Sequence, residues 1–91
     1  MASEVFSRWR EEIFRSRVIA PLAFGMSQNA IVGYFGPPDT GGLKKKGKPC
    51  VLKYGDIEFH FDHTRDHALA LIFSDDEKGR MKLCIGESAA D

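Results

Sequence analysis

The segment VLKYGDIEFHFDHTRDHALALIF, residues 51–73, holds most of the β-branched, aromatic and aliphatic side chains that can form a sheet core. From 57 to 62 (IEFHFD) apolar and polar residues alternate. A period of two sends successive side chains to opposite faces of a sheet, so this alternation predicts a half-buried strand. Residues 68–73 (ALALIF) form a nearly continuous apolar run, which is expected of a central strand buried on both faces.

The phase of the apolar residues changes at Gly55-Asp56. Leu52 and Tyr54 stand at even positions before this dipeptide, whereas the apolar residues after it, beginning with Ile57, stand at odd positions. Two structures explain the change. Gly55-Asp56 is either a two-residue hairpin turn, in which glycine supplies a positive φ, or a β-bulge within one long, bent strand.

Two polar segments further along the chain predict reversals. They are DHTRDH at 62–67 and SDDEKG at 74–79. Residues 80–85 alternate again, with Met81, Leu83 and Ile85 expected to face one way. The chain after residue 50 therefore predicts an antiparallel meander of three or four strands.

A first helix is predicted near the start of the chain. Ser3 is a suitable N-cap, and apolar residues from 5 to 14 recur at helical spacing. Trp9 lies on this apolar stripe and is expected in the core. The helix is expected to end near 17–19, because the residue before Pro21 is pushed away from helical angles.

A second, shorter helix is predicted over 28–35. Ser27 suits its N-cap, Gly36 stands where a left-handed residue ends a helix, and Pro37-Pro38 prevents continuation. Residues 39–49 (DTGGLKKKGKP) are rich in glycine and lysine and predict a flexible loop before the first strand.

Helices that precede strands, rather than alternating with them, indicate the α+β class. The 91 residues suit one domain. We therefore predict a single α+β domain, residues 1–91, in which two N-terminal helices pack on one face of a three- or four-stranded antiparallel β-meander.

The charge balance bears on the class of partner. Thirteen basic and 13 acidic residues give a formal net charge of zero. Dedicated nucleic-acid binders normally carry a basic excess, so nucleic acid is not expected as a partner. The lysines at 44, 45, 46 and 48 are expected to be solvated, because no aromatic residues are interleaved for base stacking.

Cellular location is predicted from absent signals. No apolar run approaches the roughly 18 residues that span a membrane. The first residues lack the apolar core of a signal peptide. Cys50 and Cys84 form no C-x-x-C pair; we expect two reduced thiols, although both lie in strand regions that the fold can bring together. A cytoplasmic protein is the default prediction.

A resemblance to known proteins rests on Gly25-Met26-Ser27, Val32, FGPPD at 35–39, and Tyr54. This pattern resembles small bacterial outer-membrane-assembly lipoproteins of the SmpA/OmlA type, related inhibitor-like modules and many small bacterial proteins of unknown function. The size and layout are also similar to those of some immunity proteins of bacterial toxin systems. The resemblance implies a helix–turn–helix element laid across an antiparallel sheet that works by binding other proteins.

One cluster has the residue types for chemistry: His60, Asp62, His63, Asp66 and His67. Imidazole and carboxylate groups bind zinc and suit proton transfer. His63 and His67 would form a metal pair on a helix, but the segment is predicted to be a turn. We therefore expect solvent-exposed turn residues and assign no metal, catalytic or cofactor-binding residue.

The acidic run Asp75-Asp76-Glu77 is expected at a solvated hairpin tip, since it lacks the longer array of a calcium loop. Such a tip would suit a basic partner, for example a nuclease toxin.

These patterns favour a non-catalytic, cytosolic protein-interaction module, with an immunity- or inhibitor-like role as its specific form. The mechanism would be occlusion of a partner protein through the polar face of the sheet and its loops. An exposed edge strand would also allow a homodimer to form by backbone pairing. The alternative hypothesis is a small metal-binding enzyme or sensor that uses His60, His63 and His67.

Overall fold

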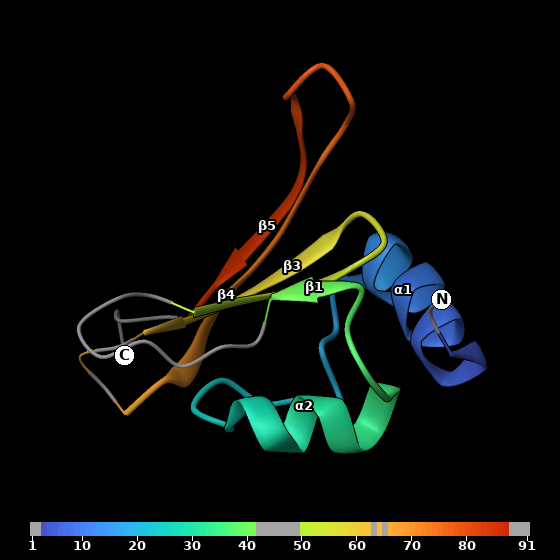
Figure 1. The fold of residues 1–91 in the computed structure, drawn as a ribbon. Coiled ribbons are helices and arrows are strands. Elements are labelled where there is room, and N and C mark those ends of the chain that lie inside the picture. Colours follow the sequence, from blue (N-terminus) through green and yellow to red (C-terminus); the bar gives the residue numbers. More distant parts are fainter. Residues whose placement is uncertain (1–2, 42–49, 63, 65, 88–91) are drawn as a thin grey trace.

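A computed structural model describes residues 3–41, 50–62, 64 and 66–87 of the chain. The elements are two helices, α1 (Glu4–Ser16) and α2 (Gln28–Phe35), followed by the strands β1 (Thr40–Gly41), β2 (Cys50–Tyr54), β3 (Ile57–Asp62), β4 (Ala68–Asp75) and β5 (Met81–Gly86). The strands form one sheet in the order β1-β2-β3-β4-β5, with every neighbouring pair antiparallel (Figure 1). The predicted α+β class and antiparallel sheet are confirmed.

Both helices begin at the predicted serine caps. The Ser3 hydroxyl accepts a hydrogen bond from the Phe6 N–H, and the Ser27 hydroxyl accepts one from the Ala30 N–H. These bonds satisfy N–H groups that have no partner inside the first helical turn. The first helix ends at Ser16, one residue before the predicted range, because Arg17 adopts a left-handed conformation with φ 60°.

Gly36 ends α2 with a φ of 83° and a ψ of −169°, so its φ is positive but it is not in the left-handed helical region. Its N–H donates to the Val32 carbonyl. The predicted bounds of this helix are confirmed.

The strand β1 was not predicted. Thr40 pairs with Lys53 and Gly41 with Leu52, within a segment that the sequence indicated to be loop. Two residues carry no period, so only the pairing with β2 makes them a strand. The remainder of that predicted loop, 42–49, lies outside the described residues.

The phase change at Gly55-Asp56 is a hairpin turn. Tyr54 pairs directly with Ile57, which leaves the two intervening residues as the loop. Gly55 has φ 59°, a value that glycine adopts without the steric cost that a Cβ atom imposes.

The strand β4 extends two residues beyond the end that the sequence predicted. Ser74 and Asp75 were assigned to a polar turn, but they continue the strand and pair with Leu83 and Met81. Ser74 is fully buried. Pairing with β5 on one side and β3 on the other overrides the turn preference of serine and aspartate.

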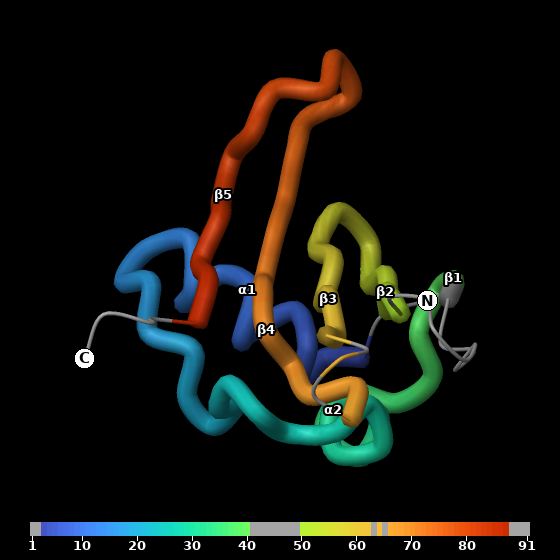
Figure 2. Tube along the Cα trace, turned by 90° about the vertical axis from the view of Figure 1, so that its left-hand side faces the viewer, coloured from blue at the N-terminus to red at the C-terminus, as the bar shows by residue number. Residues whose placement is uncertain are grey.

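The alternation predicted for β5 holds only in part. Leu83 is buried and Ile85 is half-buried, but Met81 is 64% exposed. The register shifts beyond Ser74, so that Lys82 is an extra residue between Leu83 and Met81. The β4–β5 hairpin also projects away from the rest of the molecule (Figure 2), so the side chains at its tip do not reach the hydrophobic core.

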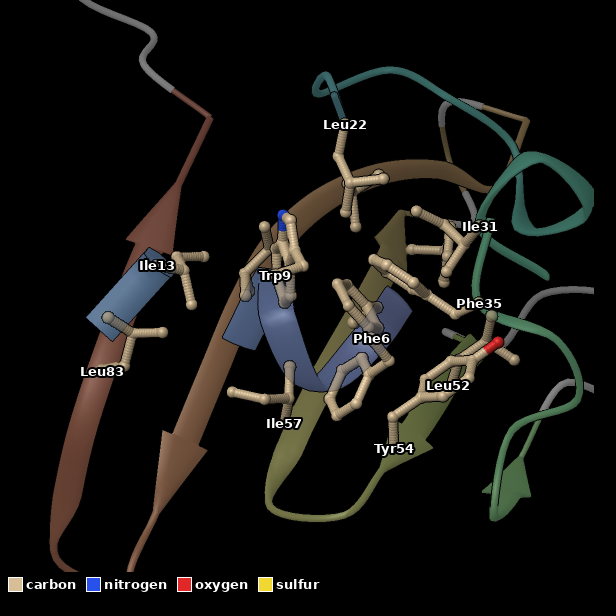
Figure 3. Packing of buried hydrophobic residues seen from close by; sticks show 14 of the residues in the cluster. Phe6, Trp9, Ile13, Leu22, Ile31, Phe35, Leu52, Tyr54, Ile57 and Leu83 are labelled. Atoms are coloured by element: carbon tan, nitrogen blue, oxygen red, sulfur yellow. The ribbon is translucent and has the colours of Figure 1, made fainter. Parts of the chain in front are cut away.

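The core is largely aromatic. Side chains from α1, α2 and β2–β5 meet in one cluster (Figure 3). Phe35 of α2 lies 5.3 Å from the rings of both Phe6 and Trp9 and 5.7 Å from that of Tyr54, measured between centroids. Ring pairs at these separations add about 0.5–1.5 kcal/mol beyond the burial of their area.

Candidate interaction surface

The sheet has a second face that no described helix covers (Figure 1). Residues in register across antiparallel strands share a face. Two such rows point away from the core, and their members are Val51, His60, Leu71 and Gly86 in one row and Lys53, Glu58, Phe73 and Cys84 in the other. We call the surface formed by Val51, Lys53, Glu58, His60, Leu71 and Phe73 the helix-free face.

The centre of the helix-free face is a contact among three side chains. His60 Nε2 lies 2.9 Å from Glu58 Oε1, and the two side chains are 34% and 23% exposed. The Phe73 ring meets the imidazole edge-on, with centroids 6.3 Å apart at an interplanar angle of 83°. The carboxylate and the aromatic ring together orient the imidazole, so the surface has a defined shape.

The apolar side chains of β4 divide between the two faces. Leu69 and Ile72 are fully buried, whereas Leu71 and Phe73 are only half-buried. The prediction that this strand is buried on both faces is therefore wrong for the described chain. A β-bulge changes the register between His60 and Phe61, because Phe61 pairs with Leu69 whereas His60 pairs with Leu71.

The predicted histidine–aspartate cluster is only partly assembled. His60 points from β3 onto the helix-free face, while His67 lies in the turn before β4. His63 lies outside the described residues. Within those residues, no group of three or more histidine, cysteine, aspartate or glutamate side chains can hold a metal ion. The metal hypothesis therefore gains no support from the described geometry.

The described contacts in the turn between β3 and β4 join residues of the turn to one another. One carboxylate oxygen of Asp62 accepts hydrogen bonds from the Thr64 N–H and hydroxyl, and the Asp62 carbonyl accepts one from the His67 N–H. Asp66 and His67 both have positive φ, 57° and 56°. His67 Nε2 is buried, and no described residue forms a hydrogen bond with it.

The acidic hairpin tip is organised by Asp76. Its carboxylate accepts hydrogen bonds from the N–H groups of Lys78 and Arg80 and from Arg80 Nε, each 2.9 Å long. These bonds, the backbone bond from Arg80 foremost, hold the pKa of Asp76 below its usual value. Asp76 is thus engaged within the turn, which leaves Glu77 as the exposed carboxylate of the tip.

The structure also bears on the two cysteines, the lysine run and the expected lack of a membrane-spanning segment. Cys50 is buried on β2 and Cys84 is exposed on β5; two strands separate them and they point to opposite faces, so they are not neighbours. The lysine run at 44–48 lies outside the described residues. Along the segments that the structure describes, no helix is long and apolar enough to cross a membrane.

The FGPPD segment and Tyr54 come together at the junction of α2 with the sheet. The Tyr54 hydroxyl donates to the Gly36 carbonyl at 2.6 Å. The Asp39 N–H donates to the Lys53 carbonyl at 2.8 Å, and the Asp39 carboxylate accepts a bond from the Gly55 N–H at 2.6 Å. Burial, and secondarily the charge of Asp39, raises the pKa of Tyr54 to about 12. These contacts join the end of α2 to β2 and to the turn that follows β2.

Sequence reasoning missed an ion cluster at the β2–β3 turn. Asp56 accepts two hydrogen bonds from Arg10 of α1, at 2.7 and 2.6 Å, and one from Lys82 Nζ of β5 at 2.6 Å. The Arg10 guanidinium lies 4.7 Å above the Phe14 ring. The hydrogen bonds from Arg10, followed by that from Lys82, hold the pKa of the Asp56 carboxyl far below its usual range.

No protein-family model, curated protein or solved structure matches this chain. The function is therefore inferred from the geometry of the chain itself.

Proposed function

We propose that this protein is a non-catalytic interaction module that binds another protein through the helix-free face. The observation that carries the proposal is the pair of large apolar side chains on that face, Leu71 and Phe73, which are only half-buried there. A solvated face of an antiparallel sheet ordinarily carries polar residues. Apolar side chains held at the centre of such a face, with polar neighbours around them, are typical of a protein-binding surface.

The composition of the helix-free face suits a protein partner. Phe73 and Leu71 supply apolar area, and the His60–Glu58 pair supplies hydrogen-bonding groups beside it. Lys53 is exposed and stands in register with Glu58, so both signs of charge are present at one side of the surface. An aromatic anchor surrounded by polar groups is the usual arrangement of a binding hot spot.

The two faces of the sheet have different roles in this proposal. In this proposal the two N-terminal helices pack on one face of the meander and add side chains to its core, and the partner binds the other face. Occlusion of a partner's functional surface would make the protein immunity- or inhibitor-like in the cytoplasm. The residue pattern in 25–39 and at Tyr54 resembles that of inhibitor-like modules, and the size and layout are similar to those of immunity proteins. The projecting β4–β5 hairpin would extend the contact beyond the sheet (Figure 2).

The test is partner binding by a Phe73→Glu variant. Proteins retained by the wild-type full chain would be identified by mass spectrometry, purified and titrated by calorimetry. We expect Phe73→Glu to weaken the affinity at least about 30-fold, because loss of a hot-spot side chain costs about 2 kcal/mol or more.

The matched control is Val5→Glu, which places the same charge at a 56% exposed site on α1. It should bind as wild type does. Fluorescence of Trp9, buried in the core, verifies that each variant is folded. Equal affinities for wild type and Phe73→Glu would contradict the proposal, as would a loss caused by Val5→Glu alone.

A further inference from the structure

The strand β5 forms one of the two edges of the sheet, and one hydrogen bond shows which of its backbone groups point away from β4. The Glu87 N–H donates to the Ala70 carbonyl at 2.9 Å, a bond that flanks the pair Leu71–Gly86. In antiparallel sheets such a flanked pair does not exchange hydrogen bonds of its own. The register is regular from Leu71–Gly86 to Phe73–Cys84, and the two kinds of pair alternate along the strands. The pair Phe73–Cys84 therefore does not exchange hydrogen bonds of its own either. The N–H and C=O groups of Cys84 and Gly86 therefore point away from β4.

These outward groups lie at an open edge of the sheet. The order of the sheet ends with β5, and no strand among the described residues pairs with its outer side (Figure 2). Cys84 and Gly86 are both exposed. Natural edge strands are usually blocked by charges, prolines or bulges. Here the extra residue Lys82 lies toward the hairpin tip, and the stretch 83–86 is uncharged and regular.

We propose that two copies of this chain pair antiparallel through β5, about a two-fold axis at Cys84, to form one continuous sheet. In this register Cys84 faces Cys84 of the second copy and exchanges both backbone hydrogen bonds with it. Leu83 faces Ile85 of the second copy, which extends the apolar inner face and covers the half-buried Ile85. The axis thus brings together donors with acceptors and apolar side chains with apolar side chains.

Charge favours a second copy over an unrelated strand. The one charged residue in MKLCIG is Lys82, which would lie opposite Gly86 of the second copy, so no like charges meet. The formal net charge of zero removes long-range repulsion between copies. The dimer does not depend on the proposed function, because none of the six residues of the helix-free face takes part in the pairing through β5.

The oligomeric state of the full chain tests this proposal directly. Analytical ultracentrifugation under reducing conditions should show a concentration-dependent monomer–dimer equilibrium for wild type. Cys84→Pro should be monomeric, because proline removes the outward N–H that would bond the second copy while leaving the bonds to β4 intact. Cys84→Ser, the matched control, keeps the backbone groups and should dimerise as wild type does.

Two further measurements remain decisive if Cys84→Pro fails to fold. Cys84→Lys changes an exposed side chain and sets like charges opposite each other, so the dissociation constant should rise at least about tenfold. A short thiol-to-thiol cross-linker should join wild-type chains through Cys84, since facing residues lie about 5.5 Å apart between Cα atoms. Monomeric wild type at every concentration, or an undiminished Cys84→Lys dimer, would overturn the proposal.

Discussion

At the scale of single residues, Ser74 is an exception within the core. It is fully buried between its register partners Ile57 and Leu83, and its hydroxyl has no hydrogen-bond partner among the residues that the structure describes. A buried polar group without a partner loses its bonds to water and gains nothing in return. Ser74 therefore opposes folding at a site where an apolar residue of the same size would fit.

We expect Ser74→Ala to raise the free energy of unfolding by about 1 kcal/mol, because the unpaired hydroxyl is removed with little change in volume. Urea denaturation followed by Trp9 fluorescence measures the effect. Ser74→Thr is the control: it keeps the hydroxyl and adds a methyl group to a packed site, so it should lower stability by about 1 kcal/mol or more. A marked loss of stability in Ser74→Ala would show that the hydroxyl has a partner.

At the scale of elements, the junction between α2 and β2 depends on a few polar contacts. Tyr54 reaches from the sheet to the Gly36 carbonyl at the end of the helix, and Asp39 is bonded to both Lys53 and Gly55. A short helix of 8 residues has little stability of its own. These contacts add to the packing of Ile31 and Phe35 in the core, which also holds the helix against the sheet.

Removal of the Tyr54 hydroxyl should weaken this junction and change its response to alkali. Tyr54→Phe is expected to lose about 1 kcal/mol, the typical net value of one hydrogen bond. The folded state raises the pKa of Tyr54 from 10.0 to about 12, so its contribution is complete below pH 10 and is lost as the pH rises toward 12.

Denaturation at several pH values between 9 and 12 would measure this loss, in wild type and in the variant. The alkaline slope should be smaller in Tyr54→Phe. Tyr34→Phe, a change at a 44% exposed site on α2, should keep the wild-type slope. The same slope in wild type and Tyr54→Phe would contradict the assignment.

At the scale of the whole molecule, Asp56 joins three distant parts of the chain. Its carboxylate in the β2–β3 turn binds Arg10 of α1 and Lys82 of β5, which are 46 and 26 residues away in sequence. The side chains are partly exposed, 28% for Asp56 and 36% and 37% for its partners, so solvent weakens the attraction. The cluster still connects the first helix to the last strand.

We expect Asp56→Asn to lower the free energy of unfolding by about 1–2 kcal/mol at neutral pH. The folded state lowers the pKa of Asp56 below its ordinary value of 3.8, so its contribution is complete above that value and is lost as the pH falls below it. Acid denaturation should therefore separate wild type from the variant above pH 4 and bring them together in stronger acid.

Glu4→Gln is the control, because the Glu4–Arg8 pair is 77% and 79% exposed and contributes little. Its stability should stay within about 0.5 kcal/mol of wild type. A similar loss in both variants would indicate a general charge effect and not this cluster.

Features carried by neighbouring residues could be predicted from the sequence alone. Ser3, Ser27 and Gly36 mark helix ends because capping is a contact between residues a few positions apart. The alternation over 57–62 identifies β3 and its buried face, because side chains in a strand have a period of two. Helix and strand signals together were enough for the α+β class.

The tertiary structure decided what depends on pairing over distance. Thr40–Gly41 is a strand only because β2 lies beside it, and Gly55-Asp56 is a turn because Tyr54 pairs with Ile57. Periodicity shows that a strand has two faces but not which of them a helix covers. The partial burial of Leu71 and Phe73 and the ion cluster at Asp56 therefore follow from the packing of the whole chain.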